Sequence, residues 1–137
     1  HVIHVRHVTD HPMAEEFRRG SPGVQIRPEG APQGGEPVVD KQTPSAFAGT
    51  RLDEELAARG VSSVIIAGFM TATCCTATAH EALGRRLRTV FSSDATAAQA
   101  HGPEAHDEVH ERALRMQRQL GAEVLSSASI ASLLDAA

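Results

Sequence analysis

Short apolar runs alternate along this chain with segments of helical periodicity, and no other feature constrains the fold as strongly. The run "SSVIIAG" at residues 62–68 is continuous and rich in β-branched residues, as in a parallel strand that is buried on both faces. The alanine-rich segment 74–86 that follows has a helical pattern, and "LRTVF" at 87–91 returns to a strand pattern. Strands that alternate with helices in this way predict an α/β fold with a mainly parallel sheet.

The remaining segments continue the alternation. Further strands are predicted at Val2–Arg6, at 36–41 and at 122–125, and further helices at 50–60, 106–121 and 129–137. We expect Thr50 to cap the helix at 50–60 and Gly60 to end it. In the helix at 106–121, the spacing predicts one buried stripe, formed by Val109, Ala113, Met116 and Leu120.

Residues 8–37 interrupt this pattern. They contain five of the seven prolines and five of the eleven glycines, and they have no apolar periodicity. Loops of this length are usually functional or mobile.

Composition excludes several classes of protein. The chain has 17 acidic and 13 basic residues, and a net charge of −4 argues against a nucleic-acid partner. No apolar run approaches the roughly 20 residues of a membrane span. The two cysteines are adjacent, and adjacent cysteines rarely bridge each other because the ring is strained. Two thiols favour a reducing compartment, and we expect the cytoplasm.

The adjacent cysteines lie in "GFMTATCCTATAHEAL", residues 68–83. Cys74 follows the strand Ser63–Ala67 across a turn that starts at Gly68, and it is expected to open the next helix. The free N–H groups and dipole at a helix N-terminus favour a thiolate and can hold a developing oxyanion. Position alone leaves a second interpretation open, in which both cysteines are small buried core residues.

The wider motif resembles the signature of the isochorismatase-like cysteine hydrolases. Gly68 and Thr71 match the signature's Gly and Thr, and Cys74 matches its nucleophile. Cys75 stands where that family usually has Val, so the resemblance implies a small apolar residue that faces the core.

A second segment, "GEPVVDKQTPSAFAGTRLDEEL", resembles the same family's lysine motif. Lys41 matches the catalytic lysine and Phe47 matches the aromatic residue of Ser-Ala-Phe. Lys41 is also the only lysine in a chain with twelve arginines. An ammonium group near a thiolate stabilises the charged form and can polarise a substrate.

The resemblance implies a fold and a reaction. The fold would be a three-layer, Rossmann-like sandwich, and the activity would be cysteine-dependent hydrolysis of a C–N bond in a small amide, lactam or ureide through a thioester. Backbone N–H groups of Met70 and Cys74 would form the oxyanion hole, in a turn with a cis peptide at Phe69–Met70. The reaction would need no cofactor and no metal, its partner would be a small-molecule substrate, and the enzyme would be a homo-oligomer, dimer or tetramer.

One part of the family's pattern has no match. The family's catalytic aspartate lies in a first strand that resembles "ALLVIDMQ", and no such segment occurs here. We therefore expect residues 1–137 to be an N-terminally incomplete hydrolase domain that lacks about one strand–helix unit, on the order of 30–50 residues. The strands at Val2–Arg6 and Ser63–Ala67 should then not pair with each other. Two alternatives stay open: a degenerate, non-catalytic binding or assembly subunit, and a thiol redox role for Cys74 and Cys75.

Other candidate residues carry weaker signals. His106 and His110 are spaced as a metal pair on one helix face, but solvent-facing histidines are the favoured interpretation. His7 could line the pocket or be a hydrogen-bonded histidine at the start of the loop. Asp94 is expected to cap the turn that follows it. Arg86 stands near the end of a helix where the family often has Gly, so a left-handed cap there must be avoided or tolerated.

Overall fold

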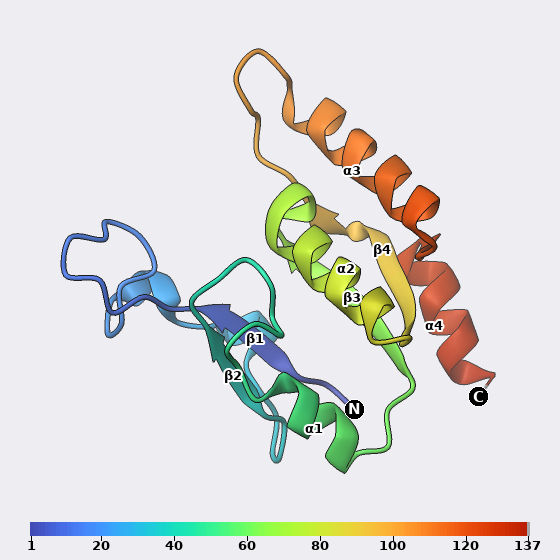
Figure 1. Ribbon diagram of the computed structural model, residues 1–137, viewed down its shortest axis with the longest axis horizontal. Helices are drawn as coiled ribbons and strands as arrows, with labels where there is room; N and C mark the ends of the chain where they lie inside the picture. Colours follow the sequence, from blue (N-terminus) through green and yellow to red (C-terminus); the bar gives the residue numbers. More distant parts are fainter. Residues whose placement is uncertain (137) are drawn as a thin grey trace. The chain divides into compact units, whose positions relative to one another are not determined.

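The computed structural model describes residues 1–136, and its strands run parallel within two sheets (Figure 1). The chain divides into two compact units, residues 1–60 and residues from 61 onward. Helices alternate with the strands, so the predicted α/β fold with a parallel arrangement is confirmed. Strand β1 belongs to the sheet of the first unit and β3 to the sheet of the second.

The first unit contains a two-stranded parallel sheet. Strand β1 (His4–His7) pairs with β2 (Val38–Lys41), from His4 opposite Val38 to His7 opposite Lys41. The ladder begins where the His4 N–H donates to the Pro37 carbonyl at 2.9 Å, two residues later than the predicted start at Val2. Val2 is 52% exposed, so its apolar side chain does not supply the packing that the alternating pattern suggested.

The long segment between these strands is ordered by polar contacts. It contains two 3₁₀ turns, Pro22–Val24 and Pro28–Gly30, and its first part folds back so that Thr9 bridges to Arg18. The Arg19 guanidinium donates to Asp10 at 2.6 Å and to Asp40 at 3.2 Å. The absence of apolar periodicity in the sequence therefore reflects a loop held by ion pairs and turns.

Helix α1 (Leu52–Ala58) is shorter than the predicted 50–60. The Thr50 hydroxyl accepts a hydrogen bond from the Leu52 N–H at 3.2 Å, so Thr50 caps the first turn from just outside the helix. Gly60 has φ of +61°, a left-handed conformation that glycine adopts without steric cost, and it terminates the element as predicted.

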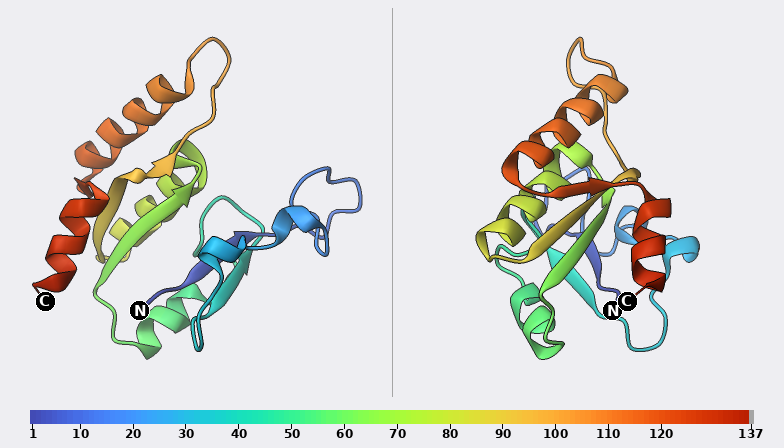
Figure 2. Two further views of the ribbon diagram at one scale, coloured as in Figure 1. Left: turned by 180° about the vertical axis from the view of Figure 1, so that it is seen from behind. Right: turned by 90° about the vertical axis from the view of Figure 1, so that its right-hand side faces the viewer.

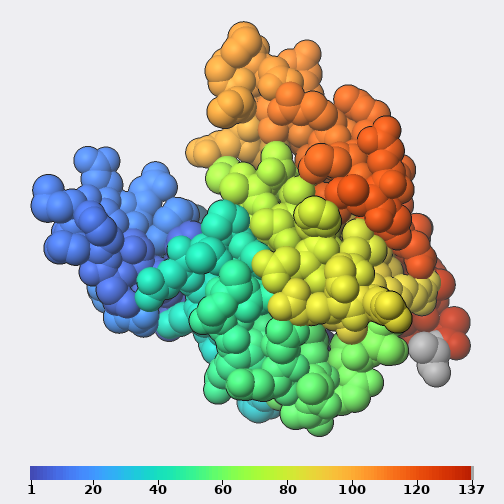
Figure 3. Space-filling model, viewed as in Figure 1, coloured from blue at the N-terminus to red at the C-terminus, as the bar shows by residue number. Residues whose placement is uncertain are grey.

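The second unit contains a three-stranded parallel sheet in the order β3-β4-β5. Its strands are β3 (Ser63–Phe69), β4 (Arg88–Ala97) and β5 (Glu123–Leu125), and its helices are α2 (Thr76–Gly84), α3 (His106–Leu120) and α4 (Ser127–Asp135). Helices α2 and α3 cover one face of the sheet and α4 lies against the other (Figure 2). The space-filling view shows α2 and α3 side by side on one surface of this unit (Figure 3).

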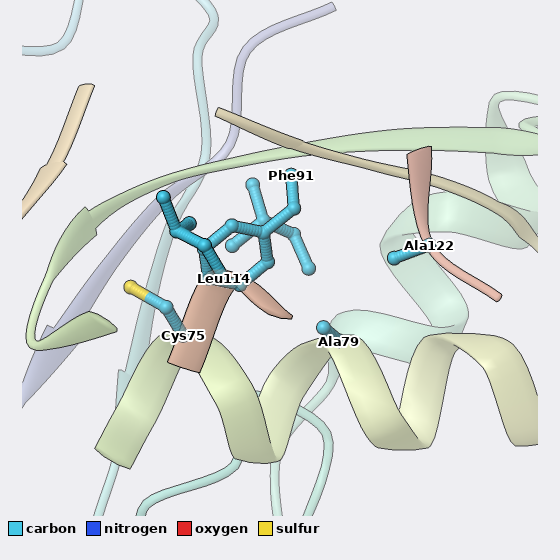
Figure 4. Close-up of a cluster of buried hydrophobic side chains, with 6 residues drawn as sticks. Cys75, Ala79, Phe91, Leu114 and Ala122 are labelled. Carbon is cyan, nitrogen blue, oxygen red and sulfur yellow. The ribbon is translucent and has the colours of Figure 1, made fainter. Parts of the chain in front are cut away.

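A small aliphatic and aromatic cluster forms the core between the sheet and these two helices. Its buried members are Ile66, Cys75, Ala79, Phe91, Leu114 and Ala122 (Figure 4). Phe91 and Ala79 are fully buried, so the close approach of α2 to β4 depends on alanine facing the phenyl ring. This packing explains how a chain with four Phe, no Tyr and no Trp builds a dense interior.

The predicted buried stripe of α3 is half wrong. Val109 and Ala113 are buried, but Met116 is 39% and Leu120 is 43% exposed. The stripe turns instead toward Leu114 and Gln117, both of which are almost completely buried. On this face Leu114 packs in the core cluster, and Gln117 donates a hydrogen bond to the Thr76 hydroxyl.

Two positions near helix ends test the sequence predictions, and only the one at Asp94 is wrong. Arg86 adopts φ of +61° after α2, so the left-handed position is tolerated by an arginine where glycine would be unstrained. Asp94 does not cap the turn that follows it. Its carboxylate accepts from the Ser127 N–H at 2.7 Å and from the Ser127 hydroxyl at 2.8 Å, which anchors the start of α4 to β4.

Helix length sets a limit on membrane insertion. The longest helix is α3, with 15 residues. Within residues 1–136, none of the helices combines the length and the apolar character that crossing a bilayer requires.

Candidate active site

Strand β3 runs directly into the turn that carries Cys74. Gly68 has φ of +121°, the Phe69–Met70 peptide is cis, and a π-helical turn then spans Thr71–Cys75 before α2 begins. The cis peptide stands where the resemblance implied it. Strand β3 extends two residues beyond the predicted end at Ala67, so Gly68 and Phe69 still pair with Thr96 and Ala97 of β4.

The sequence pattern predicted that Cys74 opens α2, and this is wrong, because α2 begins at Thr76. Cys74 lies inside the π-helical turn, one residue before the end of that turn. The turn is wide because it is closed over five residues: the Cys75 N–H donates to the Met70 carbonyl at 3.2 Å, and the Thr76 hydroxyl donates to the Thr71 carbonyl at 2.7 Å. The helical run therefore starts earlier than the alanine pattern indicated, and Cys74 is held within its first turn.

The two neighbouring thiols have different surroundings. Both cysteines are present as thiols. Cys75 is 5% exposed and packs in the cluster with Phe91 and Leu114 (Figure 4), which confirms its predicted place in the core. Cys74 is half-buried, so it is less enclosed than its neighbour.

Two side chains of α3, His110 and Gln117, bind this turn, and His110 contacts its first residue. The Thr71 hydroxyl lies 2.9 Å from His110 Nδ1, and Thr71 is completely buried. His110 Nε2 lies 2.9 Å from the Ser93 carbonyl oxygen. The interpretation of His110 as a solvent-facing histidine is therefore wrong, because both ring nitrogens have partners within the second unit.

Gln117 contacts the turn, and no sequence pattern had indicated a role for it. Its Nε2 donates to the Thr76 hydroxyl at 3.1 Å, and the residue has no exposed surface. A single Gln in a helix with mostly polar residues cannot be distinguished from a surface residue by periodicity. The available signal was its spacing of seven from His110, which places both side chains on one face of α3.

Lys41 ends β2 in the first unit and is 6% exposed. Its ammonium group donates to the Thr43 carbonyl at 2.8 Å and lies 3.2 Å from His7 Nδ1. Burial of the imidazole, together with the positive charge of Lys41, lowers the pKa of His7 below its ordinary value. A neutral His7 can accept the hydrogen bond from Lys41, so the two groups are chemically matched.

Two further predicted site residues differ in exposure. Phe47, predicted with His7 to line the pocket, is 3% exposed, and Phe69, predicted for the turn, is 77% exposed. The His7 ring packs against Phe17, with ring centroids 4.9 Å apart. Lys41, His7 and Phe47 belong to the first unit and Cys74 to the second, so the proximity of Lys41 to Cys74 stays a prediction.

A cavity of about 290 Å³ opens beside the Cys74 turn within the second unit. Its wall combines the turn, the segment after β4 and one side of α3, and it consists of Met70, Ala72, Thr73, Gln99, Ala100, His101, Val109 and Arg112. The Arg112 guanidinium in this wall is paired with Glu104 at 2.8 and 2.9 Å. Met70, predicted to donate its backbone N–H to an oxyanion, therefore also borders a space large enough for a small molecule.

The histidine pair at the start of α3 does not form a metal site with neighbouring residues. His106 is exposed and lies 2.8 Å from Asp107, whereas His110 is turned into the unit. Within the described part of the chain, no three residues with His, Cys, Asp or Glu side chains are arranged to hold a metal ion.

Comparison with known proteins places these motifs in a family. A model of the isochorismatase domain matches residues 1–129. Nicotinamidase 3 of Arabidopsis thaliana is 40% identical over 114 residues, which cover 77% of this chain and 54% of that protein. The chain spans about half the length of the curated relatives that it matches first, from 46% to 54%.

Solved structures agree with the sequence match. An isochorismatase-like hydrolase from Alkaliphilus metalliredigens superposes with a TM-score of 0.89 at 27% identity, over 98% of this chain and 72% of the other. A cysteine hydrolase from Pseudomonas syringae pv. phaseolicola gives a TM-score of 0.88 at 27% identity, over 94% and 69%. Because the family model covers residues 1–129 and the parallel α/β architecture agrees with these structures, the chain belongs to the isochorismatase family.

Proposed function

We propose that this protein is a cysteine hydrolase that cleaves the C–N bond of a small carboxamide, with Cys74 as its nucleophile. The observation that carries the proposal is the turn at the end of β3 in a chain of the isochorismatase family: the turn contains the half-buried Cys74, and its residues Met70, Ala72 and Thr73 line a cavity of small-molecule size. The carboxyl ends of parallel strands are the usual place for active sites in α/β folds.

The chemistry assigns a role to each group. The Cys74 sulfur attacks the carbonyl carbon, and the C–N bond breaks as the amine leaves with a proton. Backbone N–H groups of Met70 and Cys74 stabilise the oxyanion. Water then attacks the thioester, which releases the carboxylate and restores the thiol.

Lys41 and His7 form the second part of the proposed machinery. The Lys41 ammonium supplies a buried positive charge that stabilises the thiolate and the developing oxyanion. Neutral His7 orients that ammonium through Nδ1, at 3.2 Å. The family resemblance assigns the transfer of the thiol proton to an aspartate whose segment has no match in residues 1–137.

Similarity to a nicotinamidase supports carboxamides, rather than other C–N compounds, as substrates of this protein. The name of the plant relative, nicotinamidase, describes hydrolysis of an aromatic carboxamide. The cavity beside Met70 is lined by small and polar side chains, and Gln99, His101 and Arg112 offer hydrogen-bond donors to a polar amide. We therefore expect small polar carboxamides to be better substrates than lactams or ureides.

The test is a screen for ammonia release by the natural full-length protein, using a panel of small carboxamides, lactams and ureides. Cys74→Ala should abolish release, because the nucleophile is lost. Cys75→Val should retain most activity, because Cys75 is a core residue and the change nearly conserves its volume.

Chemical labelling provides an independent measurement. At slightly acidic pH, iodoacetamide should modify half-buried Cys74 much faster than buried Cys75. The proposal fails if Cys74→Ala retains activity while Cys75→Val loses it, or if no amide is turned over by the wild-type protein.

A further inference from the structure

Both ends of the Cys74 turn are tied to helix α3. Thr71 begins the π-helical turn and Thr76 immediately follows it, so Cys74 lies between two threonines that α3 contacts. His110 binds the hydroxyl of Thr71, and Gln117 binds the hydroxyl of Thr76. We propose that His110 and Gln117 are positioning residues that fix the Cys74 turn in the geometry needed for attack, an inference that rests on the proposed function.

The hydrogen bonds of His110 follow a fixed direction. The Ser93 carbonyl can only accept, so the ring must donate from Nε2, at 2.9 Å. In the neutral ring, Nδ1 is then an acceptor, and the Thr71 hydroxyl donates to it at 2.9 Å. The Ser93 carbonyl on β4 thus selects the tautomer that orients the hydroxyl at the start of the turn.

The second link reaches the backbone of the turn. Gln117 Nε2 donates to the Thr76 hydroxyl at 3.1 Å, and that hydroxyl donates to the Thr71 carbonyl at 2.7 Å. Thr71 is therefore held at its side chain by His110 and at its carbonyl by the Thr76–Gln117 pair. Because Thr71 and Gln117 are completely buried, water does not compete for these hydrogen bonds.

The geometry has a catalytic consequence. The turn also contains the N–H groups proposed for the oxyanion hole, and small displacements of such donors cost rate more than affinity. Loss of the contact to α3 should therefore lower kcat and leave KM nearly unchanged. The turn's internal hydrogen bonds, such as the Cys75 N–H to the Met70 carbonyl, should also open more often.

Two substitutions at His110 separate its two contacts. His110→Gln can still donate to Ser93 but offers Thr71 no acceptor at the Nδ1 position, whereas His110→Asn keeps an acceptor near Nδ1 and loses the contact to Ser93. His110→Gln should lower kcat by roughly threefold to tenfold, the value of one neutral buried hydrogen bond. His110→Asn should recover part of the kcat that His110→Ala loses.

Thr71→Val removes the partner hydroxyl with little change of volume. Its loss of kcat should match that of His110→Gln, and the double variant should be no slower than either single variant, because both remove the same hydrogen bond. His106→Gln is the matched control, since it makes the same change on the same helix at an exposed histidine and should leave kcat unchanged.

Hydrogen exchange tests the inference without any substrate. The amide of Cys75 should exchange faster in His110→Gln and in Thr71→Val, and keep its wild-type rate in His106→Gln, at matched global stability. The inference is overturned if Cys75 exchange and kcat both keep wild-type values in His110→Gln, or if the losses of the two single variants multiply in the double variant. A protein that turns over no amide yet shows the faster exchange would refute the proposed function and leave the tie between α3 and the turn intact.

Discussion

At the scale of single residues, the charge state of a side chain is set by what its neighbours do to it. Asp40 illustrates this, since hydrogen bonds from Arg6, with a smaller contribution from Arg19, lower the pKa of its carboxyl group. His7 is shifted by burial and by Lys41 in the same unit. Both shifts keep a network of defined charge beside β1 and β2.

We expect the His7 imidazole to titrate below the ordinary histidine range. Lys41→Met should raise the His7 pKa, because a neighbouring positive charge disappears while the burial stays. An NMR titration of the imidazole C–H signals measures both values. Arg6→Met is the control, since Arg6 is not among the groups that shift His7, and an unchanged His7 pKa in Lys41→Met would contradict this explanation.

The same shift links His7 to stability. The folded-state pKa is lowered, so as pH falls the unfolded state binds the proton first, and stability decreases. The contribution of His7 is complete above the unfolded pKa of about 6.5 and is lost as pH falls through the lower, folded value.

Arg86 offers a test of backbone strain. Its φ of +61° is a conformation that costs an L-residue about 1–2 kcal/mol, partly offset in glycine by the greater freedom of the unfolded chain. Arg86→Gly should therefore raise the free energy of unfolding by about 0.5–1 kcal/mol. Urea denaturation measures the change, and Arg86→Ala, which keeps the strain, should stay within about 0.5 kcal/mol of wild type; an equal gain in both variants would show that strain is not the cause.

At the scale of elements, the rotation of α3 decides which of its residues stabilise the fold. Met116 and Leu120 are exposed and Leu114 is buried against Phe91. Met116→Gln and Leu120→Gln should each change the free energy of unfolding by less than about 0.5 kcal/mol. Leu114→Ala should cost about 2–5 kcal/mol, because it leaves a cavity in the core.

Urea denaturation of these three variants distinguishes the two rotations of α3. If the stripe predicted from the sequence were right, the Met116 and Leu120 substitutions would be the costly ones. Equal losses at Met116 and Leu114 would contradict the buried face described here.

Sequence periodicity predicted the elements well and their faces less well. The strand at β3 and the helix at α3 were identifiable because each has a long, regular pattern. The rotation of α3 was not, because its buried face includes a Gln whose partner, Thr76, lies 41 residues away. The early start of the helical run at Thr71 was also hidden, because a wide turn closed by backbone and threonine hydrogen bonds has no hydrophobic period.

The candidate site could also be predicted only in part from the sequence. Cys74 and Lys41 could be selected from local motifs, because their neighbours in the sequence match a known pattern. His110 and Gln117 could not be given roles, since their contacts to the turn are made only in the folded unit.

At the scale of the whole molecule, the loop of residues 8–37 differs from the rest in how it is held. Apart from the buried Val8 and Val24, its side-chain contacts include ion pairs of exposed residues, such as Arg19 with Asp10, and such pairs stabilise weakly. Limited trypsin digestion should therefore cut first after Arg18 or Arg19 and leave the second unit intact. Mass spectrometry locates the cut, and the double variant Arg18→Gln/Arg19→Gln should delay it; a first cut within residues 61–97 would contradict this ranking of local stability.

The tie between α3 and the Cys74 turn also sets an order of events during synthesis. Thr71 and His110 are 39 residues apart, and Thr76 and Gln117 are 41 apart. A nascent chain therefore presents its cysteine turn well before the helix that secures it has left the ribosome. We therefore expect the turn around Cys74 to reach its final geometry only after α3 has been synthesised and has packed against it.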